Sequence, residues 1–224
     1  MFGGLHIEMA ALRSLGTLLQ DSGWTGSLVE ARVASSGTAE SFLSVSSVTK
    51  TTLAHQVTAC SLYKLMKEAN QDYCSDESER STLSFEDWCK QRRPESSQFQ
   101  FWNLVLDMEL TIFMLIRSFR EGNFKLYLEA LSELIPYFFA NNIVNYTRWL
   151  PIHLRDMMCL EQQLPEVTRE FYKGNFVVHK SGREFSTIAI DQAHEQNNAV
   201  IKGDGGAIGL TEDPAALRRW LVLK

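Results

Sequence analysis

The chain has 224 residues, a formal net charge of -5 at pH 7 and 45% hydrophobic residues. A chain of this length and composition can bury a core as one domain, or as one domain with a large insertion, and disorder over most of its length is excluded. The negative charge provides no long-range attraction for nucleic-acid phosphates, which argues mildly against autonomous DNA binding.

The cysteine pattern and the hydropathy indicate an intracellular protein without membrane association. No C-x-x-C pair occurs, so neither a zinc ribbon nor a thioredoxin-like motif is indicated. The four cysteines are Cys60, Cys74, Cys89 and Cys159. No signal peptide is recognisable, and the longest apolar run, Leu110 to Ile116, is too short to cross a bilayer. Met1 leads directly into a turn and a helix, which predicts that the chain begins inside a domain.

Apolar residues recur at helical spacing over most of the chain. Residues 70–84 are rich in acids and serines, which predicts an exposed loop. Helices are predicted at 6–19, 27–34, 39–45, 49–69, 84–93, 95–120, 124–140, 145–163 and 165–172. Helix 95–120 is apolar nearly all round and should be central, so Asp107 and Glu109 within it need a partner or a raised pKa. His55 and His153 are interpreted as hydrogen-bonding residues at the core edge.

The pattern changes after Gly174. Two β-prone runs around Ser181-Gly182 predict a β-hairpin over 175–190, and Asp191 is predicted to cap a helix that ends at 202. A glycine loop, 203–209, and a last helix from Asp213 should follow. The predicted fold is mainly α with a small β-hairpin. Its predicted segments are an N-terminal helical segment at 1–48, a helical bundle at 49–173, and the hairpin with C-terminal helices at 174–224.

The densest polar cluster follows the hairpin. In a helix Asp191, His194 and Glu195 stand at i, i+3 and i+4 and project from one face, where they could bind a divalent metal ion. The alternative, which the spacing favours, is that Asp191 is an N-cap, His194 bonds a carbonyl and Glu195 is solvated. His6 lies near the amino terminus, so a site that joins the two ends of the chain is a further hypothesis.

Glu8 is less suited to such a site. On a helix His6 and Glu8 point to different faces and cannot bind one ion together, so Glu8 should face solvent or contact the bundle. The glycines of 203–209 lack the spacing of a nucleotide fingerprint, and they are interpreted as a helix end, with anion binding by backbone amides as the alternative.

Three motifs carry a family resemblance: F-G-G-L-H-I-E-M at 2–9, A-H-Q-V-T-A at 54–59 and I-D-Q-A-H-E-Q-N-N-A at 190–199. In these the chain resembles a group of uncharacterised transposon-derived proteins of multicellular animals, which are similar to transposases with an RNase H-like (DDE-type) catalytic domain and a helical insertion. The resemblance implies a truncated RNase H-like α/β fold with 49–173 as the insertion. It also implies that Glu195 is the last acid of a site for two Mg²⁺ or Mn²⁺ ions.

The same resemblance implies that the site is incomplete. Gly4 stands where some relatives have Asp, and the first aspartate would lie upstream of this chain. The implied metal residues are Glu195, Asp191 and His6, and the implied catalytic residues are Glu195, Asp191 and His194. We therefore expect a fragment or degenerate descendant of a transposase-like, metal-dependent polynucleotidyl transferase or nuclease, inactive alone, with DNA as its partner and the nucleus as its location.

A second hypothesis comes from another class of protein. Aromatic side chains on the predicted bundle and the acidic overall charge are typical of a helical protein-interaction module without catalytic activity. The aromatic residues on which this hypothesis depends are Trp102, Tyr137, Phe138 and Trp149.

Overall fold

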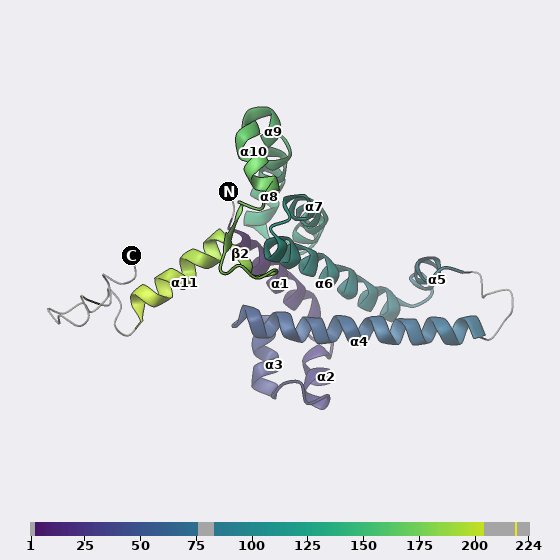
Figure 1. Ribbon diagram of the computed structural model, residues 1–224. Coiled ribbons are helices and arrows are strands. Elements are labelled where there is room, and N and C mark those ends of the chain that lie inside the picture. Colours follow the sequence, from purple (N-terminus) through teal and green to yellow (C-terminus); the bar gives the residue numbers. More distant parts are fainter. Residues whose placement is uncertain (1–2, 76–82, 204–217, 219–224) are drawn as a thin grey trace.

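The computed structural model describes residues 3–75, 83–203 and 218 (Figure 1). Most of these residues are helical, and two short strands form an antiparallel sheet. The prediction of a mainly α fold with a small β-hairpin is therefore confirmed. The predicted last helix from Asp213 and the glycine loop beyond Gly203 lie outside the described residues.

The amino-terminal helix α1 (Gly4–Leu19) lies inside the protein and forms part of its core. Ile7, Leu12 and Leu15 are fully buried on different sides of the helix. Helices α2 (Trp24–Glu30) and α3 (Ser36–Leu43) follow, and the long helix α4 (Val48–Ser75) then crosses α6. The apolar residues of α1 thus contact elements from the whole chain.

Helix α4 runs six residues past its predicted end at 69. The residues of this extension are polar, but Tyr73 is partly buried, and its ring stacks under Arg92, whose guanidinium carbon lies 4.5 Å from the ring centroid. Arg92 belongs to α5 (Phe85–Arg92), whose cap is Ser84, as predicted: its hydroxyl accepts a hydrogen bond from the Asp87 backbone N–H at 3.1 Å. A tertiary contact therefore extends a helix that the local composition would end.

Helix α6 (Ser97–Glu121) is the centre of the body, and α7 (Phe124–Ala140) is antiparallel to it across the turn at Gly122. By length and composition alone, α6 is the one helix of the described residues that could cross a membrane. Here it packs against α1, α4, α7 and β2 and buries ten of its residues, as the core helix of a folded domain does. The predicted central position of this helix is confirmed.

Helices α8, α9 and α10 form an arm beyond α7 (Figure 1). The predicted helix 145–163 is divided into α8 (Val144–Met158) and α9 (Leu160–Gln163), with the break at Cys159, and α10 spans Pro165–Tyr172. Helix α8 packs against α7 with Leu150 and His153 and exposes its opposite face.

The strands β1 (Val177–His179) and β2 (Thr187–Ala189) are shorter than the predicted hairpin. They pair antiparallel with Val178 opposite Ile188, and the Thr187 hydroxyl donates a hydrogen bond to the Phe119 carbonyl of α6. Helix α11 (Ile190–Lys202) begins at the residue after β2. The finer prediction of an RNase H-like fold gains no support from this two-stranded sheet.

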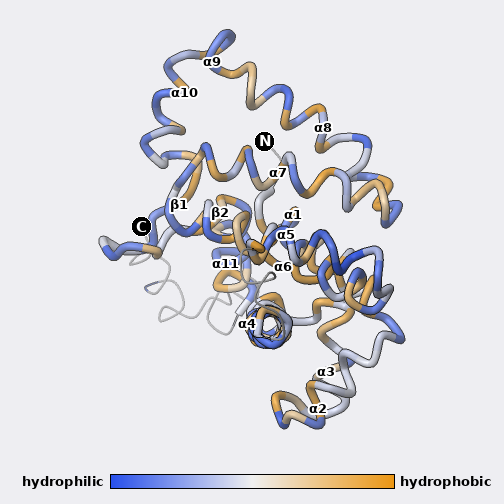
Figure 2. Tube along the Cα trace, turned by 90° about the vertical axis from the view of Figure 1, so that its right-hand side faces the viewer, coloured by the Kyte–Doolittle hydropathy of each residue, from blue (hydrophilic) through white to orange (hydrophobic). Residues whose placement is uncertain are grey.

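The main hydrophobic core draws on all three predicted segments, 1–48, 49–173 and 174–224, because α1, α6, α7 and both strands contribute to one cluster. Figure 2 shows hydrophobic stretches of the trace in the middle of the molecule. The division into three segments stays a prediction. A smaller cluster joins α4, α5 and α6 around Trp88 and Leu106.

Candidate functional site

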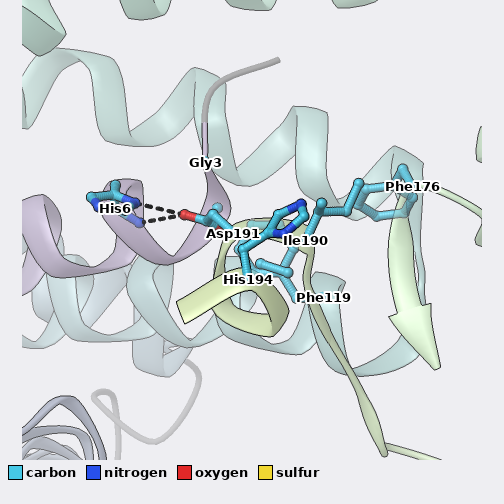
Figure 3. A pocket seen from close by; sticks show the side chains of 9 residues that line it. Gly3, His6, Phe119, Phe176, Ile190, Asp191 and His194 are labelled. Carbon is cyan, nitrogen blue, oxygen red and sulfur yellow. Dashed lines mark hydrogen bonds and ion pairs between the residues drawn. The ribbon is translucent and has the colours of Figure 1, made fainter. Parts of the chain in front are cut away.

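The two ends of the described chain meet at a pocket of about 360 Å³. Its walls come from the start of α1, the end of α6, both strands and the first turn of α11 (Figure 3). The residues that line it are Gly3, Gly4, His6, Phe119, Phe176, Ala189, Ile190, Asp191 and His194. Three of the predicted site residues, His6, Asp191 and His194, therefore lie at one place, and a functional site that joins both ends stays a prediction.

Asp191 holds the two ends together, because its carboxylate caps α1. Oδ1 accepts the backbone N–H of Leu5 at 3.0 Å, and Oδ2 accepts the backbone N–H of His6 at 3.1 Å. Oδ2 also accepts a hydrogen bond from His6 Nδ1 at 2.8 Å. The capping residue of α1 is Gly3, which has no side chain for this purpose, so an acid 186 residues later in the chain satisfies the first free N–H groups of the helix.

This arrangement corrects the predicted local role of Asp191. Helix α11 begins at Ile190 with Ala189 as its N-cap and no side-chain cap, so Asp191 does not cap its own helix. It lies in the first turn of α11 and turns toward α1 instead. The start of α1 offers the Asp191 carboxylate three donors, namely two backbone N–H groups and the His6 ring. The start of α11 would offer it fewer donors.

Two glycines explain why α11 comes so close to α1. A Cβ atom on Gly3 would clash with the Asp191 carboxylate. A Cβ atom on Gly4 would lie 2.5 Å from the Phe119 ring and 2.8 Å from Ala189 Cβ. Gly3, the N-cap of α1, and Gly4, its first residue, therefore provide the space in which α11, β2 and α6 meet the start of α1.

The carboxyl of Asp191 is ionised in the folded protein. Burial alone would raise the pKa of Asp191, but the hydrogen bonds from Leu5 and His6 outweigh burial and hold this pKa below its usual value of 3.8. An ionised carboxylate has no proton to donate, so the His6 ring donates its Nδ1 proton to Asp191. The His6 side chain is 57% exposed, so the contact lies at the surface.

Glu195 and His194 complete the set of predicted site residues. His194 lines the pocket on the side of Asp191 away from His6 (Figure 3). Glu195 is exposed and does not line the pocket. The part of the chain that the structure describes contains no cluster of three or more potential metal ligands. Three hydrogen bonds from α1 and His6 already occupy most of the acceptor capacity of the Asp191 carboxylate, and metal binding by Glu195, Asp191 and His6 stays a prediction.

Glu8 and the aromatic wall are features that the sequence did not reveal. Burial raises the pKa of Glu8 to about 7, while Arg120 lowers it and Asp191 raises it further, so Glu8 is a partly buried acid near Asp191. Phe119 and Phe176 form the apolar side of the pocket and pack against Tyr127. Phe176 lies in the predicted hairpin and precedes the observed strand β1, but no local pattern indicates that α6 brings Phe119 to the same place.

A second acid–imidazole pair lies in the core between α4 and α6. His55 Nδ1 and Glu109 Oε1 are 2.9 Å apart, and Trp24 stacks on His55 with ring centroids 4.7 Å apart. Burial raises the pKa of Glu109 to about 9 and lowers the pKa of His55 to about 4, so at pH 7 Glu109 is protonated and donates to a neutral His55. The predictions that Glu109 needs a partner or a raised pKa and that His55 forms a hydrogen bond are confirmed, but His55 is fully buried and not at the core edge as predicted.

The fold and the pocket define a mainly helical protein in which Asp191, in the first turn of α11, caps the start of α1. Residues 67–224 match the model of a family described as a domain of unknown function, DUF8702, and the chain belongs to this family. The matched residues include Asp191 but exclude His6. No curated protein and no solved structure matches the chain.

Proposed function

We propose that this chain is a helical protein-interaction module without catalytic activity of its own. The observation that carries the proposal is the outward face of α8, which exposes 54% of Trp149 together with Ile152 one turn further on. Tryptophan and arginine are residue types often found at the energetic centre of protein interfaces, and the exposed Arg148, which precedes Trp149, has no ion-pair partner in the described residues.

The predicted aromatic residues contribute differently to this surface. Phe138 is fully buried and belongs to the core, and Trp102 and Tyr137 are partly buried against it. Of these four aromatic residues, Trp149 is the one whose side chain is exposed to solvent. A partner would therefore engage the α8 face with an apolar recess for Trp149 and a carboxylate for Arg148.

The test compares two exposed aromatic residues. Full-length wild type, Trp149→Ala and Phe185→Ala are used as baits in cell extract, and each protein captured by wild type is purified and its binding measured by calorimetry. Phe185 is the control because it is 58% exposed but lies between the strands. We expect Trp149→Ala to weaken binding more than about tenfold and Phe185→Ala to leave it unchanged. Equal binding by all three proteins would remove the proposal.

The meeting of His6 and Asp191 favours a second function, that of a transposase-like DNA-processing protein. In that proposal the chain is a remnant of an RNase H-like domain, located in the nucleus, with Glu195, Asp191, His194 and His6 left from a Mg²⁺ or Mn²⁺ site. The bonds that Asp191 makes to α1 support inactivity of the chain alone. Mn²⁺-dependent cleavage of plasmid DNA by wild type, absent in Glu195→Gln, would favour this function over the first, and equal background in both would discard its enzymatic form.

A further inference from the structure

Helix α4 has one face in the core and one in solvent. Its buried face carries Thr51, Ala54, His55 and Thr58 toward α1, α3 and α6. On the opposite side an exposed stripe runs over four turns at alternating spacings of three and four residues. Its members, called the α4 stripe, are Lys50, Leu53, Val57, Cys60 and Lys64.

The α4 stripe has the spacing with which helices pair. Leu53 is 56% exposed and Val57 44%, although both are large and apolar, and Cys60 beside them is exposed as well. Side chains that repeat at three and four residues stay on one side of a helix and insert between those of a second helix. Leu65 is more exposed, at 61%, but about 120° around the helix from Leu53, so it lies outside this seam.

The charges of α4 indicate what kind of helix the stripe fits. Lysines stand at both ends of the stripe, and residues 48–67 include Lys67 as well but no acid. This is unusual in a chain of net charge -5. The first acid is Glu68, which forms an exposed ion pair with Lys64 at 3.7 Å, and such pairs contribute little. Lys50 has no ion-pair partner in the described residues.

The same charges exclude a second copy of this chain as the natural occupant. A parallel pair would place Lys50 against Lys50 of the other copy, and an antiparallel pair centred on Val57 would place Lys50 against Lys64. Like charges at these positions oppose pairing in both orientations. We infer that the α4 stripe binds an amphipathic helix of another protein that carries acidic side chains at both ends of its apolar stripe.

This inference rests on a surface separate from α8. Figure 2, which looks nearly along α4, shows α2 and α3 on one side of that helix and the α8 arm at the far end of the molecule. Loss of binding at α8 in Trp149→Ala would therefore leave the α4 stripe intact. The proposed function and the α4 inference can fail independently.

The test uses the full chain and two synthetic helical peptides of about 21 residues, equal in their apolar stripe. One peptide has glutamates at both ends of the stripe and the other has lysines. Fluorescence anisotropy should show that the acidic peptide binds at least about tenfold more tightly than the basic one, and that the variant Lys50→Glu with Lys64→Glu reverses this preference. Binding of neither peptide, or equal binding of both, would overturn the inference.

Matched variants distinguish binding at the α4 stripe from nonspecific hydrophobic binding elsewhere on α4. Val57→Glu should weaken binding of the acidic peptide more than about tenfold, whereas Leu65→Glu and Trp149→Ala should bind it as wild type does. Both glutamate substitutions are at exposed positions, and unchanged circular dichroism would confirm folding. Equal losses in Val57→Glu and Leu65→Glu would overturn the inference, and so would a wild-type dimer that Val57→Glu dissociates.

Discussion

The protein contains two acid–imidazole pairs of nearly equal length and opposite charge state. His6 and Asp191 lie 2.8 Å apart at the surface, with their side chains 57% and 17% exposed. His55 and Glu109 lie 2.9 Å apart in the core, with 1% and 0% exposed. The first acid is ionised because helix N–H groups and His6 stabilise its charge, and the second is protonated because burial penalises charge. The contact alone does not fix the protonation state, and the surroundings do.

Removal of one member of the buried pair should have the largest effect. We expect His55→Ala to lower the free energy of unfolding by about 3 kcal/mol, because it leaves Glu109 without its partner and a cavity beside Trp24. Urea denaturation at pH 7 measures the change. The exposed His194→Ala is the control and should unfold like wild type. A loss of less than 1 kcal/mol in His55→Ala would show that the buried pair is not structurally important.

The buried pair also predicts a loss of stability at alkaline pH. The pKa of Glu109 is raised from 4.5 to about 9, so its contribution is complete below 4.5 and is lost as pH rises toward 9. The pKa of His55 is lowered from 6.5 to about 4, so its contribution is present above 6.5 and is lost as pH falls toward 4. The two trends offset each other between about 4.5 and 6.5.

Above pH 6.5 the trend from Glu109 remains alone. Wild type should lose on the order of 3 kcal/mol of unfolding free energy between pH 6.5 and 9 through this group. Glu109→Gln keeps the shape and a hydrogen-bond donor but cannot ionise, so its stability should change far less over this range. Parallel pH profiles of the two proteins in urea titrations would refute a protonated Glu109.

A single methyl group added at Gly4 tests how closely α1 approaches α6 and β2 beside the surface pair. Gly4→Ala should cost about 2 kcal/mol, because the new Cβ would meet Phe119 and Ala189. Gly26→Ala in α2 is the matched control, since a Cβ there meets no atom within 4 Å and alanine favours helix. Thermal unfolding of both variants measures the difference. If Gly4→Ala is as stable as Gly26→Ala, α1 and β2 are not packed as described.

Loss of charge at the surface pair should have the smallest effect. Asp191→Asn should cost about 1 kcal/mol at pH 7 and speed hydrogen exchange at the Leu5 and His6 amides, since a neutral amide caps a helix less well than a carboxylate. The pKa of Asp191 is lowered, so its contribution is present above 3.8 and is lost as pH falls through the folded pKa. The cost should therefore vanish in acid.

Glu195→Gln is the control for that experiment. Glu195 is exposed and has no hydrogen bond or ion pair within the described residues, so this substitution should change neither stability nor amide exchange. Equal effects of Asp191→Asn and Glu195→Gln would contradict the capping role of Asp191.

The sequence predicted the secondary-structure elements better than the tertiary contacts between them. Helical periodicity located the core helix α6, and the switch to alternation after Gly174 located the hairpin, because both patterns are local. It also indicated that Glu109 needed a partner, since a carboxylate in an apolar helix cannot stay charged alone. The partner His55 and the role of Asp191 at α1 depend on contacts across 54 and 186 residues, which no local pattern records.

A carboxyl ¹³C titration by NMR of the full chain tests the difference between the two pairs most directly. The account predicts that Asp191 titrates below 3.8 and that Glu109 stays protonated at pH 7 and titrates near 9. Titration of both carboxyls near their ordinary values, or an ionised Glu109 at pH 7, would contradict it.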